Sequence, residues 1–403
     1  MKTNVAVFFG GRSVEHEISV ISAIQAINAF DSEKYNVIPV YITKQGKWVS
    51  GPELLNISNY RDMKALEQNV EEVYMRPLFG DYNLYKVNPG GNIFTKKNPV
   101  FSELHVAFPV LHGSHGEDGM FQGLLETIGI PFVGCDTLSS ANGMDKITMK
   151  MILRESGIPV VDFEWFTDRE WITRKEEIIS AIEKNLGYPV IVKPANLGSS
   201  IGINKAADRT ELISTVETAS KFSSRLIVES MVCDMMEINC SVLGDADVHE
   251  SSVCEEPIKK KDFLTYDEKY GSGSKSGMQA SEKKIPADIP AETSEKIRKL
   301  AGDTFRVLSC NGVARIDFMI DRDSGEIYVN EINTIPGSLS FYLWEETGIT
   351  FTQLIDKLIS LALKRKRDID RKTFSYDTNI FAMGAGLKGS IKNGLKGGSK
   401  SLR

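Results

Sequence analysis

Residues 312–337, GVARIDFMIDRDSGEIYVNEINTIPG, combine two apolar runs with polar side chains that can do chemistry. The segment between the runs is rich in Asp, Ser and Gly, so the stretch is predicted to form a β-hairpin. Side chains alternate between the two faces of a strand. A turn centred on that segment therefore sets Asp317 opposite Glu331 and Arg315 opposite Asn333.

Two opposed carboxylates repel each other unless a cation lies between them. Two carboxylates and an amide oxygen, here Asp317, Glu331 and Asn333, form a hard oxygen set that suits Mg²⁺ held together with substrate phosphates. The alternative is a hairpin face with scattered, solvated charges. The sequence IPG directly after Asn333 ends the strand with backbone suited to a site, and this favours the metal.

A second candidate site follows the predicted strand 188–193. Lys193 ends this strand, Pro194 fixes the exit of the chain, and NLGSSIG (196–202) forms a loop of small residues. Backbone N–H groups of such a loop can cover phosphates, and the lysine can reach them as a point charge. The loop lacks the G-K-[ST] ending of a P-loop, and a plain glycine-rich turn is the alternative.

Polar residues also follow two N-terminal strands. Glu15 opens a predicted helix over 15–30, where it is either a favourable first-turn carboxylate or a ligand for an ammonium group. The segment HGSHGEDG holds His112 and His115. Its glycine-rich loop offers no third nitrogen or sulfur ligand, which argues against zinc.

Hydrophobic periodicity supplies the elements that must position these residues. Strands are predicted at 4–9, 35–42, 104–110, 188–193, 226–229, 237–243, 313–320 and 326–333. Helices are predicted at 15–30, 121–128, 146–155, 176–186, 292–308 and 351–363. Stretch 50–100 is expected to be a peripheral insertion of short elements. Stretch 255–284 is expected to be a long polar loop whose tyrosines favour a closing lid, and 379–403 a flexible basic tail.

Composition limits the class of protein. The 403 residues are 41% hydrophobic and 25% charged, with a net charge of −6, which is typical of a globular protein of two or three domains and argues against a nucleic-acid partner. No long apolar run or signal pattern points to a membrane or to export. The five cysteines form no C-x-x-C pair, so buried free thiols in the cytoplasm are expected.

The combined motifs resemble those of the D-alanine–D-alanine ligases of the ATP-grasp superfamily. The motifs are GGRSVEHEIS, HGSHGEDG, MDK, KPANLGSSIG, DEKY, ARIDF and NEINTIPG, spread from about residue 4 to 365. The resemblance implies a mixed α/β fold of three domains. The three domains are an N-terminal Rossmann-like domain (1–145), a central ATP-grasp subdomain (146–233) and a C-terminal catalytic domain (234–366). A flexible tail (367–403) follows them.

The resemblance also implies an activity. ATP would phosphorylate the carboxylate of one D-alanine, the amine of a second would attack the acyl phosphate, and the dipeptide would serve peptidoglycan and cell-wall synthesis. ATP and two magnesium ions are implied, with Mn²⁺ as a substitute, and a cytoplasmic homodimer without nucleic-acid or membrane partners is expected.

Site residues follow from the same resemblance. The ATP-binding set is Lys146, Lys193, Glu229, Val232 and Glu237. The metal set is Asp317, Glu331 and Asn333. The catalytic set is Glu15, Ser199, Tyr270, Arg315 and the backbone of Gly337. The substrate-binding set is His112, Lys269, Tyr342 and Leu343.

Two positions depart from the family pattern. Ser230 stands where many members have a lysine beside adenine, and Tyr342 stands where many have a serine that contacts the second substrate. D-Serine or D-lactate as second substrate therefore remains an alternative, and so does a nucleotide-binding protein without turnover. The presence of Tyr270 in DEKY favours an amino acid over a hydroxy acid at the second position, and Leu343 favours D-alanine.

Overall fold

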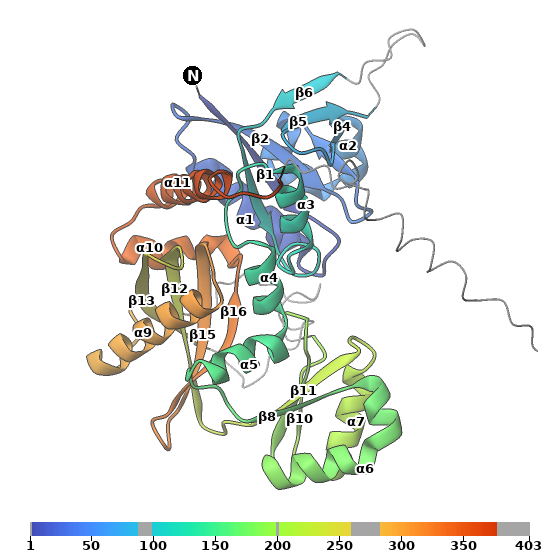
Figure 1. Ribbon diagram of the computed structural model, residues 1–403, viewed down its shortest axis with the longest axis vertical. Coiled ribbons are helices and arrows are strands. Elements are labelled where there is room, and N and C mark those ends of the chain that lie inside the picture. The colour runs from blue at the N-terminus through green and yellow to red at the C-terminus, as the bar shows by residue number, and fades with distance from the viewer. Residues whose placement is uncertain (1, 88–98, 199–200, 259–282, 377–403) are drawn as a thin grey trace, which may run out of the picture. The chain divides into compact units, whose positions relative to one another are not determined.

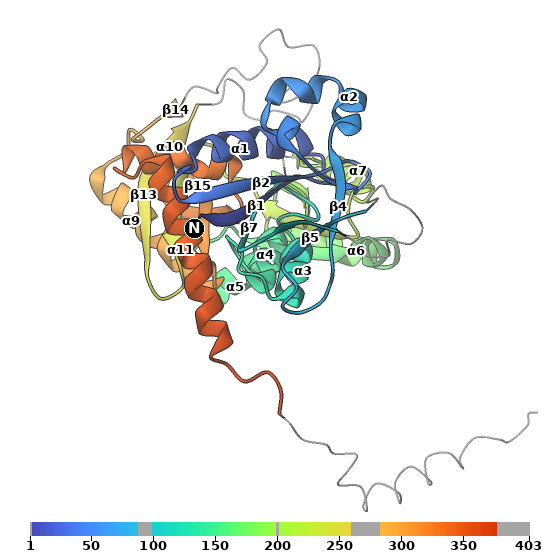
Figure 2. The same cartoon turned by 90° about the horizontal axis from the view of Figure 1, so that it is seen from above.

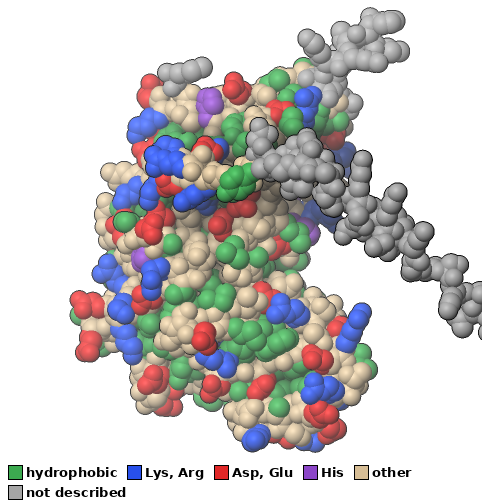
Figure 3. All heavy atoms as spheres, in the orientation of Figure 1, with side chains coloured by type: hydrophobic (Ala, Val, Ile, Leu, Met, Phe, Trp, Pro, Cys, Tyr) green, Lys and Arg blue, Asp and Glu red, His purple; other side chains and the backbone are tan. Residues whose placement is uncertain are grey.

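The computed structural model describes residues 2–87, 99–198, 201–258 and 283–376 (Figure 1). The chain divides into two units, Met1–Lys364 and Arg365–Arg403, and the sheets all lie in the first. The described strands form three sheets with helices packed against them, which confirms the mixed α/β class. On the face drawn in Figure 3, acidic and basic side chains are interspersed. Within the described ranges, no helix combines the length and the apolar composition needed to cross a membrane.

The first sheet has the strand order β6-β5-β4-β3-β2-β1-β7. Its parallel part consists of β1 (Thr3–Gly10), β2 (Tyr35–Ile42) and β7 (Val106–Leu111). Helix α1 (His16–Ala29) packs against one face of β1 (Figure 2), and α3 (Met120–Ile128) packs against the other. Coverage on both faces explains why β1 and β7 are nearly continuous apolar runs.

Stretch 50–100 does hold short elements, but its strands extend the first sheet. The additional strands are β3 (Trp48–Ser50), β4 (Glu71–Met75), β5 (Asn83–Lys86) and β6 (Val100–Glu103), all antiparallel to their neighbours. Two 3₁₀ turns (Pro52–Leu55 and Ile57–Arg61) and α2 (Met63–Gln68) lie between β3 and β4.

The second sheet is antiparallel, with the order β10-β9-β11-β8. Its strands are β8 (Phe163–Thr167), β9 (Val190–Pro194), β10 (Asn204–Ala206) and β11 (Arg225–Ser230). Helices α6 (Asp168–Asn185) and α7 (Arg209–Ala219) cover the face that carries Val190, Val192, Leu226 and Val228. Because side chains alternate along a strand, Lys193 and Glu229 lie on the opposite face.

The third sheet has the order β14-β13-β12-β15-β16. Its strands are β12 (Met235–Gly244), β13 (His249–Pro257), β14 (Lys283–Lys284), β15 (Gly312–Asp321) and β16 (Ile327–Asn333). Helix α9 (Ala291–Val307) packs on the face that carries Ile238, Cys240, Ile316 and Phe318. The alternate residues of β12 and β15 are Asn239, Ser241, Arg315 and Asp317, so the polar side chains share the other face.

Several predicted boundaries change. The helix predicted over 176–186 is the part of α6 that follows a kink at Arg174. The part before the kink was not predicted; it begins at Asp168, where Thr167 and Glu170 form a capping box that the apolar pattern does not reveal. The helix predicted over 351–363 continues to Asp370 as α11 (Phe351–Asp370), so residues 367–370 of the expected tail are helical. The loop predicted from 255 begins later, because β13 runs to Pro257. Residues 259–282 and 377–403 lie outside the described part of the chain.

Three further helices lie between these elements. The sequence analysis predicted α5 (Lys146–Glu155) but neither α4 (Thr137–Met144) nor α10 (Phe341–Glu346). All five cysteines are free; four are buried as expected, whereas Cys233 is exposed.

Candidate active site

The central hairpin has the predicted register. In β15 and β16, Asp317 pairs with Glu331 and Arg315 pairs with Asn333. A β-bulge follows, because Phe318 pairs with Val329 and leaves Asn330 without a partner in the ladder. The bulge was not predicted, and it has a consequence for the site: the Asn330 Oδ1 atom accepts a hydrogen bond of 3.2 Å from the Nζ atom of Lys193.

Two rows of polar residues cross the third sheet. In the first row, Asn239 of β12 is the register partner of both Glu255 and Asp317, and Asp317 is the partner of Glu331. In the second row, Arg315 is the partner of Ser241 and of Asn333. Because these residues occupy neighbouring strands at the same level, their side chains project from one face.

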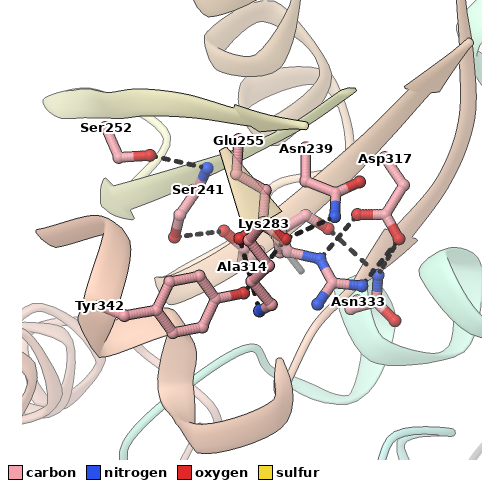
Figure 4. Close-up of polar contacts among 10 residues, drawn as sticks. Asn239, Ser241, Ser252, Glu255, Lys283, Ala314, Asp317, Asn333 and Tyr342 are labelled. Carbon is pink, nitrogen blue, oxygen red and sulfur yellow. Dashed lines mark hydrogen bonds and ion pairs between the residues drawn. The ribbon is translucent and has the colours of Figure 1, made fainter. Parts of the chain in front are cut away.

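Arg315 forms an ion pair with Asp317, whose side chain Figure 4 labels. The Arg315 Nε atom lies 2.7 Å from Asp317 Oδ1, and its second guanidinium nitrogen lies 2.8 Å from Oδ2. The Asn333 amide also donates a hydrogen bond of 3.0 Å to Asp317. Burial raises the pKa of Asp317 to about 6, against the opposing attraction of Arg315. Arg315 thus compensates the Asp317 carboxylate, which the sequence analysis placed in the metal set.

Glu331 faces a lysine from a distant segment. The Nζ atom of Lys146, the first residue of α5, lies 3.4 Å from Oε2 of Glu331 and donates a 2.9 Å hydrogen bond to the Leu197 carbonyl. Burial opposes ionisation of Glu331, but Lys146 and Lys193 outweigh it and lower the pKa of this carboxyl. Lys146 therefore connects α5, the loop after β9 and the hairpin.

Glu229 lies between two lysines on the face of the second sheet that is free of α6 and α7. Its Oε2 atom lies 2.8 Å from Lys193 Nζ, and its Oε1 atom lies 3.2 Å from Lys150 Nζ. Burial opposes ionisation, but Lys150 and Lys193 hold the pKa of Glu229 at about 2. The sequence analysis did not name Lys150, although its place four residues after Lys146 sets both on one face of α5.

Glu15 brings three loops of the first unit together. It is the N-terminal cap residue of α1, and its side chain lies beside Gly113 and Gly198. A Cβ atom at Gly113 would lie 2.6 Å from Glu15 Oε2, and Gly113 has a φ of +71°, so only glycine fits there. The carboxylate therefore sits where GGRS, HGSHGEDG and the loop after Lys193 meet.

His112 is buried beneath these loops. Its Nε2 atom lies 3.0 Å from the Ser22 hydroxyl of α1. Burial lowers the pKa of His112 to about 4, although a hydrogen bond with the Ile335 backbone opposes the shift. The imidazole is therefore neutral at physiological pH, which suits a hydrogen-bonding group better than a cation.

Glu117 is a further residue that the sequence analysis missed. It accepts hydrogen bonds from the backbone N–H of Gly113 at 2.7 Å and of Ile335 at 3.1 Å. Burial, and next the negative charge of Glu15, raise the pKa of Glu117 to about 8. The side chain ties the HGSHGEDG loop to the segment that leads to Gly337.

The three residues after Gly337 are left-handed. Ser338, Leu339 and Ser340 have φ values of 53°, 54° and 51° in the turn Gly337–Ser340. Each such residue costs about 1–2 kcal/mol when it is not glycine. Helix α1 stabilises the turn, because Ser22 Oγ accepts a 3.0 Å hydrogen bond from the Ser338 N–H. No atom within the described structure lies within 4 Å of a Cβ placed on Gly337, so a ligand can approach its backbone.

The remaining candidates are placed as follows. Tyr342 is half-buried in α10 and donates a 3.3 Å hydrogen bond to Glu255, whereas the adjacent Leu343 is fully buried. Val232 and Glu237 are half-buried at the junction of β11 and β12. Ser199, Lys269 and Tyr270 lie outside the described residues.

Sequence comparisons find known proteins that are similar to most of this chain. The family profile described as "D-ala D-ala ligase N-terminus" matches residues 4–135, and "D-ala D-ala ligase C-terminus" matches residues 152–360. A D-alanine–D-alanine ligase from Thermosipho melanesiensis is 43% identical over 383 residues, which are 95% of this chain and 99% of the relative. One from Acetivibrio thermocellus is 41% identical over 374 residues, which are 91% of this chain and 97% of the relative.

Solved structures are similar over nearly the whole length. A D-Ala:D-Ser ligase from Enterococcus faecalis has a TM-score of 0.76 and 33% identity, with 90% of this chain and 100% of that chain covered. The D-alanine–D-alanine ligase from Coxiella burnetii has a TM-score of 0.75 and 29% identity, with 92% and 96% covered. This chain therefore belongs to the D-alanine–D-alanine ligase family, whose fold is of the ATP-grasp type.

Proposed function

We propose that this protein joins two D-alanine molecules at the expense of ATP, through an acyl phosphate, to supply D-alanyl-D-alanine for peptidoglycan precursors. The observation that carries the proposal is the meeting of two lysines with the hairpin. Lys146 lies 3.4 Å from Glu331, and Lys193 lies 3.2 Å from Asn330. Phosphoryl transfer requires cations and metal ligands around the transferred group, and little covalent chemistry from the protein.

ATP and magnesium use follow from membership of the family. The donor set fits the ion, because Asp317, Glu331 and Asn333 offer carboxylate and amide oxygens on adjacent strands. We propose that these residues hold two magnesium ions, with Mn²⁺ as a substitute. Bound magnesium would neutralise charge on the phosphates during transfer.

The nucleotide contacts are part of the same proposal. Lys146 and Lys193 would hold the phosphates, while Glu229, Val232 and Glu237 would contact adenine and ribose. Support comes from the position of Lys193 near the end of β9 and from Lys150, which pairs with the other oxygen of Glu229. Lys193 can leave Glu229 for a phosphate without stranding a buried carboxylate, because Lys150 remains as its counter-ion.

The acyl-transfer half of the reaction needs donors aimed at an oxyanion. We assign this role to Arg315 and to the backbone N–H of Gly337, with Glu15 on the first ammonium group and His112 near the first carboxylate. Neutral His112 and the open space beside Gly337 are compatible with these roles. By the family pattern, Ser199, Lys269 and Tyr270 would complete the site when the lid closes over the acyl phosphate.

D-Serine as the second substrate is the other candidate. The similarity to a D-Ala:D-Ser ligase at a TM-score of 0.76 and the hydroxyl of Tyr342 in the candidate site both favour it. The curated relatives above, at 43% and 41% identity, are named D-alanine–D-alanine ligases, and we therefore give D-alanine precedence. The three-domain boundaries, the homodimer and the cytoplasmic location stay proposals that rest on the family alone.

Phosphate release from ATP tests the function. The protein is incubated with D-alanine, D-serine, D-lactate and L-alanine, singly and in pairs, and the products are separated and quantified. D-Alanine alone should support phosphate release and dipeptide formation. With equimolar D-alanine and D-serine, D-alanyl-D-alanine should predominate. An excess of D-alanyl-D-serine would favour the other candidate, and the absence of any ligation would contradict the proposed function.

A further inference from the structure

A buried carboxylate without an assigned role lies at the end of the first polar row. Glu255 of β13 is 2% exposed. Its Oε1 atom accepts hydrogen bonds from Asn239 Nδ2 at 2.9 Å and from the Tyr342 hydroxyl at 3.3 Å (Figure 4). Its Oε2 atom has no hydrogen-bond partner among the described residues, and the nearest cation, Lys283 Nζ, lies 3.5 Å away.

Asn239 adds a second acceptor of the same kind. The residue is 3% exposed, and within the described structure its Oδ1 atom has no hydrogen-bond partner. A buried acceptor left unsatisfied costs about 1–3 kcal/mol. These two acceptors belong to register partners on adjacent strands, so one group can reach both. A ligand that brings several N–H donors would satisfy both, and an ammonium group carries three.

Cations flank the same cluster. Lys283 of β14 lies 3.8 Å from the centre of the Tyr342 ring, an aromatic contact that holds a cation at a partly exposed position. Arg315 projects from the adjacent polar row on the side of the hairpin. The cluster thus offers acceptors for an ammonium group and cations for a carboxylate, the two groups of a free amino acid.

The register fixes where this cluster lies relative to the reacting groups. Glu255 is two strands away from Asp317 in the same row, which corresponds to roughly 10 Å. A small molecule between them would touch both the cluster and the region assigned to the acyl phosphate. The cluster is therefore placed to receive the amino acid that attacks.

We propose that Glu255 and Asn239 bind the ammonium group of the second amino acid, and that Lys283, held against the Tyr342 ring, binds its carboxylate. The inference rests on the proposed ligase function and adds the residues that determine the chemical class of the second substrate. Glu255 is a further determinant of amino acid over hydroxy acid, in addition to Tyr270, which the sequence analysis named. A hydroxy acid brings one hydroxyl donor and no positive charge, so it would satisfy only one of the two acceptors and would leave Glu255 with Lys283 as its only close cation among the described residues.

The decisive variant is Glu255→Gln, which keeps the shape of the side chain and removes its charge. Lost hydrogen bonds to a charged group correspond to about 10- to 100-fold in affinity. The KM of the second D-alanine should rise by about that factor, while the KM values of ATP and of the first D-alanine stay near wild type. With D-alanine as the first substrate, the ratio of dipeptide to D-lactate ester should fall by a similar factor.

The chain offers a matched control. Glu256 is the next residue of β13, faces the opposite side of the strand and pairs with Lys284 at 3.3 Å. Glu256→Gln should leave both the KM of the second substrate and the product ratio unchanged. An equal effect of the two variants, or a Glu255→Gln protein with an unaltered product ratio, would overturn the proposal.

Two further variants separate the roles and cover a misfolded Glu255→Gln protein. Lys283→Met should raise the KM of the second D-alanine. It should leave the ratio of dipeptide to ester unchanged, because D-alanine and D-lactate both carry the carboxylate that Lys283 would bind. Tyr342→Phe keeps the ring beneath Lys283 and should have a smaller effect on this KM than Lys283→Met. An unaffected KM in Lys283→Met would contradict the carboxylate assignment.

The wild-type protein distinguishes this proposal from the function on which it rests. If the wild type forms no dipeptide from D-alanine and ATP, the ligase function fails, and this inference fails with it. If the wild type forms the dipeptide and the Glu255 and Lys283 variants match it in KM and product ratio, the ligase function stands and only this inference is wrong.

Discussion

Lys150 and Glu229 form an ion pair of 3.2 Å in which the lysine side chain is fully buried and the glutamate side chain is 2% exposed. Burial lowers the pKa of Lys150 to about 8, although the attraction of Glu229 opposes the shift. Lys193 pairs with the other oxygen of the same carboxylate. The proposed nucleotide site therefore holds two cations against one buried anion.

Removal of one partner of this pair should destabilise the fold. Lys150→Met leaves Glu229 with Lys193 as its only close cation among the described residues, so the decrease should stay below the about 3–5 kcal/mol that follows when a buried charge loses its only partner. Chemical unfolding should show this decrease in the free energy of unfolding. The double variant Lys150→Met/Glu229→Gln should recover part of the loss, because the buried carboxylate that lost one of its two cations is gone. Equal stabilities of the single and double variants would show that the pair is not coupled.

The metal assignment predicts a loss of turnover without a loss of stability. Glu331→Gln keeps the shape of the ligand and removes its charge, so turnover should fall at least ~10²-fold. Steady-state rates measured over a range of Mg²⁺ concentrations test this. Glu326→Gln, an exposed position in the turn of the same hairpin, is the control and should behave as wild type. Normal turnover of Glu331→Gln at ordinary Mg²⁺ would contradict the assignment.

The buried imidazole predicts a pH dependence of stability. The pKa of His112 is lowered to about 4 in the folded chain, against an ordinary value of 6.5. Between these pH values the unfolded chain binds a proton at His112 that the folded chain does not. The contribution of His112 to the free energy of unfolding is therefore fully present above pH 6.5 and is lost as the pH falls towards 4.

The His112→Gln variant isolates this contribution. The difference in unfolding free energy between wild type and His112→Gln should change by roughly 3 kcal/mol from pH 7.5 to pH 4. The pKa of His16 is also lowered, chiefly by burial, but this residue is present in both chains and its effect cancels. A difference that does not vary with pH would exclude His112 as the source.

Truncation tests the C-terminal segment. Residues 379–403 contain no apolar periodicity that could pack on a core, so a chain that ends at Asp370 should retain its activity and melting temperature. Differential scanning calorimetry and the phosphate-release assay would measure both. A large decrease in melting temperature would show that this segment is packed in the folded protein.

The sequence predicts best the parts of the site that depend on neighbouring residues. The pairing of Asp317 with Glu331 follows from strand alternation and one turn, and the structure has this register. The bulge at Asn330 was not predictable, because the apolar pattern is the same with or without it. The left-handed Ser338 was not predictable either, because the hydrogen bonds that it donates to α1, more than 300 residues away in sequence, stabilise it.

Long-range polar pairs account for most of what the sequence analysis missed. Glu255 lies in a segment whose polar composition suggested a loop, and its buried place depends on β12, β14 and α10. Lys150 lies on an amphipathic helix whose apolar stripe is evident, but its partner Glu229 comes from β11. Local periodicity identifies elements, whereas the partners of buried charges depend on how those elements pack.

The polar row across the third sheet also limits how the protein can change its substrate. Neighbouring strands are held about 4.8 Å apart by backbone hydrogen bonds, so the spacing between Glu255, Asn239, Asp317 and Glu331 does not depend on side-chain identity. Point mutation can replace a group in this row but cannot move it. If the proposed second-substrate site is correct, adaptation to a larger or smaller substrate is left to the short helix α10, from which Tyr342 contacts the row through Glu255. In a lineage under selection for a new cell-wall terminus, substitutions should accumulate in α10 while the row stays fixed.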